Sequence, residues 1–201
     1  MGHRPPAVIA LRVPLVLASA SPRRRDLLAR LGLAFSVRPS DADETWPDLP
    51  PGPASEEVAL RKARAIDAAG ALVLAADTVV VLDGDVLGKP ADAAEAHATL
   101  ARLAGRTHTV ATGLALRLGD RETTAHALTA VTFAPLTDAE IAAYVATGSP
   151  LDKAGSYGIQ DDLGALLVER IEGDYFNVVG LPLRTLYETL RAFVPDLVTL
   201  D

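Results

Sequence analysis

Serine and arginine residues gather where a β-type run gives way to a helix start. Residues 19–25 read Ser-Ala-Ser-Pro-Arg-Arg-Arg, with Ser21 as a plausible N-cap and Pro22 at the first helical position. Such a junction exposes unpaired backbone N–H groups, and arginine adds bidentate recognition of phosphate. Cations at a helix N-terminus oppose the dipole, which favours an anion site. A solvated face of three arginines is an equally good interpretation.

Two carboxylates are candidates for metal binding or proton transfer. Asp77 lies in the run Ala-Ala-Asp-Thr-Val-Val, an otherwise apolar strand, where an ionised side chain is costly unless it is paired or binds a metal. A structural Asp–Arg pair is the alternative. Glu44 lies in an acidic loop and is the natural second oxygen ligand for a hard cation such as Mg²⁺.

Three lysines next to turns or on a predicted helix could neutralise phosphate charge. They are Lys62, Lys89 before Pro90, and Lys153 before Ala154-Gly155. Each of them alone is also compatible with an ordinary surface lysine. The chain contains neither the Walker-type phosphate loop nor the glycine fingerprint of dinucleotide-binding folds, so neither of those functions has support.

The elements that must position these residues alternate between strand and helix patterns. We expect strands at 15–20, 72–82, 108–118, 123–133 and 166–171, and helices at 21–31, 55–69, 92–103, 137–146 and 183–193. Residues 39–53 carry several prolines and acids and predict an irregular loop. Asp83-Gly84 predicts a hairpin turn, and Thr137 with Glu140 a capping box. The pattern indicates an α/β protein with a mixed sheet.

Length and composition favour one soluble globular domain. The 201 residues predict a tail over 1–13, a single domain over 14–195 and a short tail over 196–201. The net charge of −7 argues against a nucleic-acid polymer as partner. Having no cysteine fits a reducing cytoplasm, and no apolar stretch is long enough to cross a membrane. Arg12 and Pro14 interrupt the apolar N-terminal run, which argues against a secretory signal.

Five ordered segments together resemble the Maf family of nucleoside triphosphate pyrophosphatases. They are spread over most of the chain: residues 17–24, 76–80, 88–90, 151–160 and 177–183. The resemblance implies an elongated mixed sheet flanked by helices, with two lobes around a central cleft, as in ITPase-like folds. It also implies attack of water on the α-phosphorus of a bound nucleoside triphosphate, a divalent Mg²⁺ or Mn²⁺ cofactor, and a homodimer.

The same resemblance assigns roles to individual residues. Asp77 matches the catalytic carboxylate that accepts a proton, and Glu44 matches an acid of the metal site. The basic active-site positions are matched by Arg24, Lys62 and Lys89, and the expected substrate-binding residues are Ser19, Ser21, Arg23, Thr78, Lys153 and Gln160.

Three positions distinguish a subgroup that prefers dTTP and UTP from a sister subgroup that acts on 7-methyl-GTP. Arg23, Thr78 and Gln160 match the first subgroup. The amide of Gln160 both donates and accepts hydrogen bonds, which suits the edge of uracil or thymine. One departure is Ser149, which stands where the family usually carries glutamate. If that glutamate serves the metal or the lobe geometry, cation affinity is weaker in this chain.

Two other functions compete with pyrophosphate release. A nucleotide-binding regulator of septum formation would bind dTTP without turnover, and a plain phosphatase would release orthophosphate. The products therefore decide among the three interpretations.

Overall fold

The structure divides into two compact units. The computed structural model describes residues 9–161 and 163–199. Unit 1 contains the described residues up to Asp77 together with Thr112–Ala127 and those from Gly180 onward, whereas unit 2 contains Thr78–Ala111 and the described part of Leu128–Val179. Three long strands contribute residues to both units: β4 (Leu72–Leu82), β6 (Thr107–Leu118) and β7 (Arg121–Phe133).

The strands form one mixed sheet in the order β3-β2-β4-β6-β7-β8, with β5 added beside β4. β2 (Leu15–Leu17) is parallel to both β3 (Ser36–Val37) and β4. β5 (Asp85–Leu87) and β8 (Val168–Glu172) are antiparallel to β4 and β7. The expected mixed α/β architecture is therefore confirmed, although the first two residues of the strand predicted at 166–171 belong to the short helix Gly164–Leu167.

The two expected tails are described only in part. β1 (Ala10–Leu11) pairs antiparallel with β9 (Val198–Thr199), and a 3-10 helix covers Pro195–Leu197. Residues 1–8 and 200–201 lie outside the described residues.

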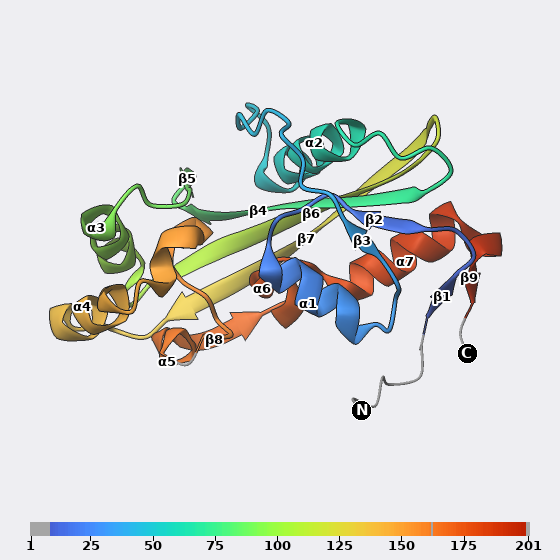
Figure 1. Ribbon diagram of the computed structural model, residues 1–201. Helices are drawn as coiled ribbons and strands as arrows, with labels where there is room; N and C mark the ends of the chain where they lie inside the picture. Colours follow the sequence, from blue (N-terminus) through green and yellow to red (C-terminus); the bar gives the residue numbers. More distant parts are fainter. Residues whose placement is uncertain (1–8, 162, 200–201) are drawn as a thin grey trace. The chain divides into compact units, whose positions relative to one another are not determined.

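Three helices belong to unit 1: α1 (Pro22–Arg30), α2 (Pro51–Arg64) and α7 (Leu183–Phe193). Figure 1 shows α2 on one side of the sheet and α1 and α7 on the other. Small and β-branched side chains of β2, β4 and α2 form an apolar cluster that includes Val16, Ala59 and Val73. The predicted start of α2 at Ser55 is wrong, because Pro51 and Pro53 fit the first turn, where no N–H is needed.

A close approach of α2 to β6 sets the depth of that helix in unit 1. A Cβ added at Gly113 would lie 2.2 Å from the Ser55 carbonyl carbon. Similarly, a Cβ at Gly52 would lie 2.4 Å from the His126 ring. The Gly113 contact is with backbone, so only glycine at position 113 allows α2 to pack where it does, whereas a side chain at position 52 would require the His126 ring to move.

Unit 2 holds four further helices and two 3-10 turns. The helices are α3 (Ala93–Leu103), α4 (Asp138–Ala146), α5 (Gly164–Leu167) and α6 (Tyr175–Val179), and the turns are Ser149–Asp152 and Ala154–Ser156. α3 packs against α4 (Figure 1). The capping box of Thr137 with Glu140 is confirmed. The hairpin turn between β4 and β5 is also confirmed, with positive φ at both Asp83 and Gly84.

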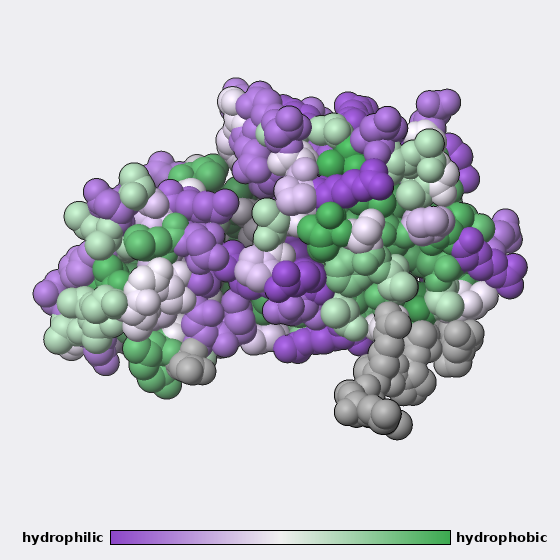
Figure 2. Space-filling model, viewed as in Figure 1, coloured by the Kyte–Doolittle hydropathy of each residue, from purple (hydrophilic) through white to green (hydrophobic). Residues whose placement is uncertain are grey.

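The surface mixes polar and apolar residues. Hydrophilic residues cover much of the face seen in Figure 2, with apolar residues interspersed. Leu166 and Leu128 are the most exposed of the described large apolar side chains. No helix within residues 9–161 and 163–199 combines the length and apolar character needed to span a membrane.

A buried aromatic cluster in unit 2 contains His108, Phe133 and Tyr157, packed edge to face in all three pairs. The His108 Nε2 atom is hydrogen-bonded to the Tyr157 hydroxyl at 2.8 Å. Its Nδ1 atom has no hydrogen-bond partner among the described residues. Burial lowers the pKa of His108 from 6.5 to about 4, so the ring is neutral near pH 7.

This depressed pKa predicts a loss of stability in mild acid. As pH falls below 6.5, the unfolded chain protonates residue 108 whereas the folded chain resists until about pH 4. The contribution of His108 is therefore present above pH 6.5 and is lost between that value and pH 4, by about 3 kcal/mol. Urea unfolding across this range should be less pH-dependent for His108→Gln than for the original chain. Equal slopes would contradict the expectation.

Candidate active site

The predicted strand–helix junction is present in unit 1. β2 ends at Leu17 and α1 begins at Pro22, with Ser21 as N-cap accepting from the backbone N–H of Arg24 at 3.5 Å. The backbone N–H of Ser21 in turn donates to the Ser19 hydroxyl at 3.2 Å. Both serines therefore shape the turn, and Ser19 is nearly buried.

The three arginines of this junction have different surroundings. The Arg24 guanidinium donates through Nε to the Gly180 carbonyl at 2.9 Å and through Nη1 to the Ser19 hydroxyl at 3.3 Å. Burial lowers the pKa of Arg24, and the nearby Asp77 carboxylate opposes this shift. Arg23 is half-buried, whereas Arg25 is exposed and pairs with Asp26. The interpretation as a solvated face therefore suits Arg25 and not Arg24.

Lys62 joins the two candidate carboxylates. Its ammonium lies 2.7 Å from Asp77 Oδ1 and 3.0 Å from Glu44 Oε1. The side chains of Lys62 and Asp77 are 9% and 13% exposed, whereas Glu44 is 57% exposed. Burial of a charge is tolerable when a partner of opposite charge is present, and each buried group supplies this to the other. Asp77 is thus paired with Lys62, and its carboxylate also lies near the Arg24 guanidinium.

A second interaction explains how an exposed loop presents Glu44 to this lysine. On the N-terminal side Asp43 accepts from both the N–H and the hydroxyl of Thr45, at 2.9 and 2.6 Å. Arg61 of α2 then donates to the Thr45 carbonyl at 2.8 Å. The loop is thereby fixed to the same helix that carries Lys62. Sequence reasoning missed Arg61, because its partner lies in a loop without periodicity.

The pair of carboxylates fits a divalent cation that shares its ligands with a substrate. No group of three or more acidic, histidine or cysteine residues that could hold a metal occurs among the described residues. Mg²⁺, however, is usually held by one or two carboxylates plus substrate phosphates and water, not by an all-protein cage. Glu44 and Asp77, which reach the same ammonium, supply this kind of donor set.

The other predicted site residues belong to unit 2. Thr78 follows Asp77 on β4 and is half-buried, and Lys89 is exposed. The carbonyl of Gly88, next to Lys89, accepts from the backbone N–H of Gly155 at 3.1 Å. Gln160 is exposed at the end of the segment that starts at Lys153. Their assignment to substrate binding stays a prediction.

Lys153 is buried and engaged within its own unit. Its ammonium contacts the Ser149 carbonyl at 2.6 Å, Asp152 Oδ1 at 2.7 Å and Asp161 Oδ2 at 3.3 Å. Ser149 also donates its hydroxyl to Asp161 at 2.5 Å. Ser149 therefore takes part in a polar cluster of unit 2, while Glu44 and Asp77, the candidate metal ligands, belong to unit 1.

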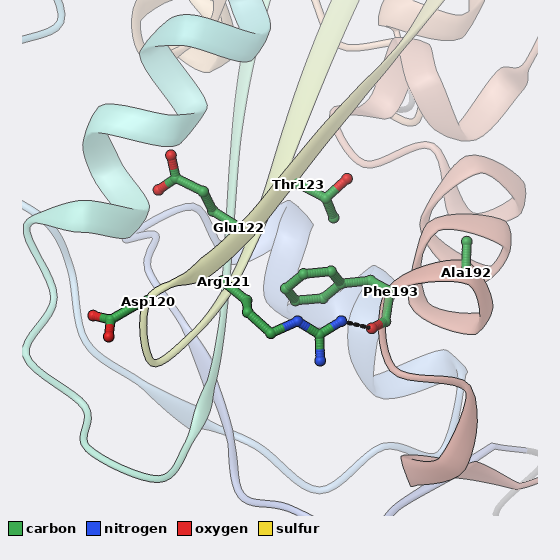
Figure 3. A pocket seen from close by; sticks show the side chains of 6 residues that line it. All are labelled: Asp120, Arg121, Glu122, Thr123, Ala192 and Phe193. Atoms are coloured by element: carbon green, nitrogen blue, oxygen red, sulfur yellow. Dashed lines mark hydrogen bonds between the residues drawn. The ribbon is translucent and has the colours of Figure 1, made fainter.

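A shallow hollow in unit 1 contains none of the predicted site residues. It is lined by the end of the β6–β7 hairpin and the end of α7: Asp120, Arg121, Glu122, Thr123, Ala192 and Phe193 (Figure 3). The Arg121 guanidinium donates to the Phe193 carbonyl at 2.8 Å and lies over its ring. A cation at the C-terminus of α7 satisfies a carbonyl and favours the dipole, so this contact is structural.

Comparison with known proteins decides the family. The family model described as Maf-like protein matches residues 14–193. The chain belongs to the Maf-like protein family. This Maf-like chain is 57% identical over 195 residues to a dTTP/UTP pyrophosphatase of Salinibacter ruber, covering 94% of this chain and 96% of the relative. It is 61% identical over 188 residues to a dTTP/UTP pyrophosphatase of Moorella thermoacetica, covering 90% and 96%.

The fold of the Maf-like chain is also similar to a solved structure. The structure of the Staphylococcus aureus Ham1 protein matches with a TM-score of 0.50 and 16% sequence identity, covering 91% of this chain and 98% of that one. At this identity the likeness concerns the fold alone.

The shared ammonium predicts strong coupling between Lys62 and Asp77. Lys62→Met removes the ammonium that pairs with a mostly buried carboxylate, and should lower the unfolding free energy by about 3 kcal/mol. The double variant with Asp77→Asn should recover part of that loss, because no buried charge remains. Urea unfolding of the four proteins at neutral pH measures this coupling.

The exposed pair of Arg184 and Glu188 on α7 provides a matched control. Its own cycle should give about 0.5 kcal/mol or less. If the Lys62 and Asp77 losses are simply additive, the two side chains do not form the pair described.

Proposed function

We propose that this Maf-like protein hydrolyses dTTP and UTP to the nucleoside monophosphate and pyrophosphate. The family, and the two relatives that share more than half of their residues with this chain and are called dTTP/UTP pyrophosphatases, support this function. The observation that carries the proposal is the buried Lys62 shared by Asp77 and Glu44 in unit 1.

Within this proposal Asp77 acts as general base. Its Oδ1 atom is held by Lys62, which fixes the carboxylate in the middle of β4. The carboxylate accepts a proton from a water molecule as the water oxygen bonds to the α-phosphorus. The bond from that phosphorus to the bridging oxygen breaks, and pyrophosphate leaves with the electron pair.

The cations of unit 1 stabilise the charge that develops on the phosphate oxygens. Arg24 presents a guanidinium that the Gly180 carbonyl and the Ser19 hydroxyl hold in place next to Asp77. Lys62 holds the carboxylates and has a third N–H donor. We assign Lys89 of unit 2 to the same task, and Ser19, Ser21, Arg23, Thr78 and Lys153 to substrate binding.

A divalent cation, Mg²⁺ or Mn²⁺, would supply further neutralisation of the triphosphate. Glu44 and Asp77 are the residues that would hold it. We further propose that the protein works in the cytoplasm as a homodimer, without a nucleic-acid polymer or a membrane as partner.

Product analysis tests the function directly. The protein is incubated with dTTP, UTP, CTP or 7-methyl-GTP and Mg²⁺ or Mn²⁺, and the products are separated. The expected products are pyrophosphate and the monophosphate, with dTTP and UTP preferred. Release of orthophosphate would overturn the proposal, and so would binding of dTTP without metal-stimulated turnover.

Asp77→Asn should reduce kcat by about a hundredfold to ten-thousandfold, because the amide cannot accept the proton. Thermal unfolding establishes that the variant is folded. Asp85→Asn on β5 changes an exposed aspartate paired with Arg102 and serves as the control with unchanged turnover. Near-normal turnover by folded Asp77→Asn would eliminate this residue as the base.

A further inference from the structure

Gln160 occupies the third position of a closed turn in unit 2. The backbone N–H of Asp161 donates to the Gly158 carbonyl at 3.0 Å, which closes a four-residue β-turn over Gly158–Asp161. Ile159, at the second position, is buried, whereas Gln160 is exposed. The turn therefore faces inward at one residue and presents the next one outward.

The hydroxyl of Tyr144 bridges the first and last residues of this turn. It accepts from the backbone N–H of Gly158 at 3.0 Å and donates to Asp161 Oδ2 at 3.2 Å. Tyr144 lies on α4 and is 2% exposed. Burial raises the pKa of Tyr144 to about 12, so the phenol keeps the proton that it donates.

The same carboxylate oxygen of Asp161 collects further donors. The Ser149 hydroxyl and the Lys153 ammonium reach it at 2.5 and 3.3 Å. With the Tyr144 hydroxyl, three donors reach one oxygen of the half-buried Asp161, which restricts the conformations of this side chain. The last residue of the turn is thereby tied to both the 3-10 helix of Ser149 and the segment that begins at Lys153.

Neighbouring atoms pack closely against two glycines, Gly158 and Gly164. A Cβ at Gly158 would lie 2.6 Å from Asp161 Oδ2 and 2.7 Å from Lys153 Cε. A Cβ at Gly164, the first residue of α5, would lie 2.1 Å from the Gly158 carbonyl oxygen and 3.0 Å from the Tyr144 hydroxyl. A side chain at either position would clash with the residues that support the turn, so glycine allows this close packing.

We propose that Tyr144 and Asp161 are positioning residues that fix the backbone from which Gln160 extends to read a uracil or thymine base. An amide can pair with the N–H and C=O groups of such a base, and a fixed backbone limits the positions from which that amide reaches the base. The supported backbone reduces the ordering that binding would otherwise require. This inference extends the proposed function and depends on it.

A double-mutant cycle tests the positioning role. Gln160→Ala should lower the ratio of kcat/KM for UTP to that for CTP, and Tyr144→Phe should lower it about tenfold, mainly through KM for UTP. The double variant should be no less selective than Gln160→Ala alone, because the hydroxyl acts through Gln160. Tyr187→Phe on α7 removes a hydroxyl outside the cluster and should leave the ratio unchanged.

Additive losses of selectivity, or an unchanged ratio in Tyr144→Phe, would overturn the inference. If Tyr144→Phe folds poorly, Ser149→Ala removes a donor from the same Asp161 oxygen and should shift the ratio in the same direction by less.

Amide hydrogen exchange separates failure of this inference from failure of the proposed function. The Gly158 and Asp161 N–H groups should exchange faster in Tyr144→Phe than in the original chain, at similar global stability. If the original chain hydrolyses no nucleotide, the proposed function fails, and the role of Gln160 in base reading fails with it. Faster exchange in Tyr144→Phe would still show that the Tyr144 hydroxyl supports the turn. Unchanged exchange would show that the hydroxyl does not hold the turn.

Discussion

A single ammonium, buried between two carboxylates, is the constraint on which unit 1 depends. Lys62 and Asp77 are both largely removed from water, so each charge needs a partner of opposite sign close by. Their meeting requires α2 to lie deep against the sheet, and Gly113 and Gly52 permit that approach. The apolar cluster formed by β2, β4 and α2 is made mostly of Ala and Val, whose small side chains suit this close approach. Small core residues and the buried ion pair are two consequences of the same close packing.

Attraction of an anion to the junction of β2 and α1 depends on nearby cations and not on the net charge of the chain. The chain carries a net charge of −7, so its overall field does not attract a triphosphate. Arg24 compensates locally, because its desolvated guanidinium is held by a backbone carbonyl and a serine hydroxyl. A desolvated cation next to carboxylates is screened less by salt than a surface one. Recognition of an anion can therefore persist at an acidic protein surface.

The sequence predicted the elements whose signals are local. The helix of Leu183–Phe193 has the expected bounds, and the capping box of Thr137 and the hairpin turn at Asp83 are where their residue types require. The start of α2 was wrong because prolines that usually break helices are compatible with a first turn. Propensity alone does not reveal that His126 and a glycine of that turn are in contact.

The candidate site shows the same division. Ser21 and Asp77 stand out from the residue types around them, whereas Arg61, Tyr144 and Asp161 do not. Arg61 reaches a loop 16 residues earlier in the chain, and Tyr144 reaches Asp161 across 17 residues. Such contacts depend on how the elements pack, and no short pattern encodes them. The resemblance to Maf motifs assigned roles to the site residues, and the structure shows the contacts that hold some of these residues in place.

In the turn at Gly158–Asp161, the residues that hold the backbone differ from Gln160, the residue proposed to contact the base. Among the described residues, the contacts that close and hold it use the backbone, Tyr144, Ser149, Lys153 and Asp161, and not the side chain of Gln160. An exchange at position 160 would therefore alter what the turn offers to a ligand without weakening what holds it. Mutations at such a position are nearly neutral for folding and open to selection on chemistry. Position 160 can therefore vary in evolution while the scaffold that supports the turn is retained.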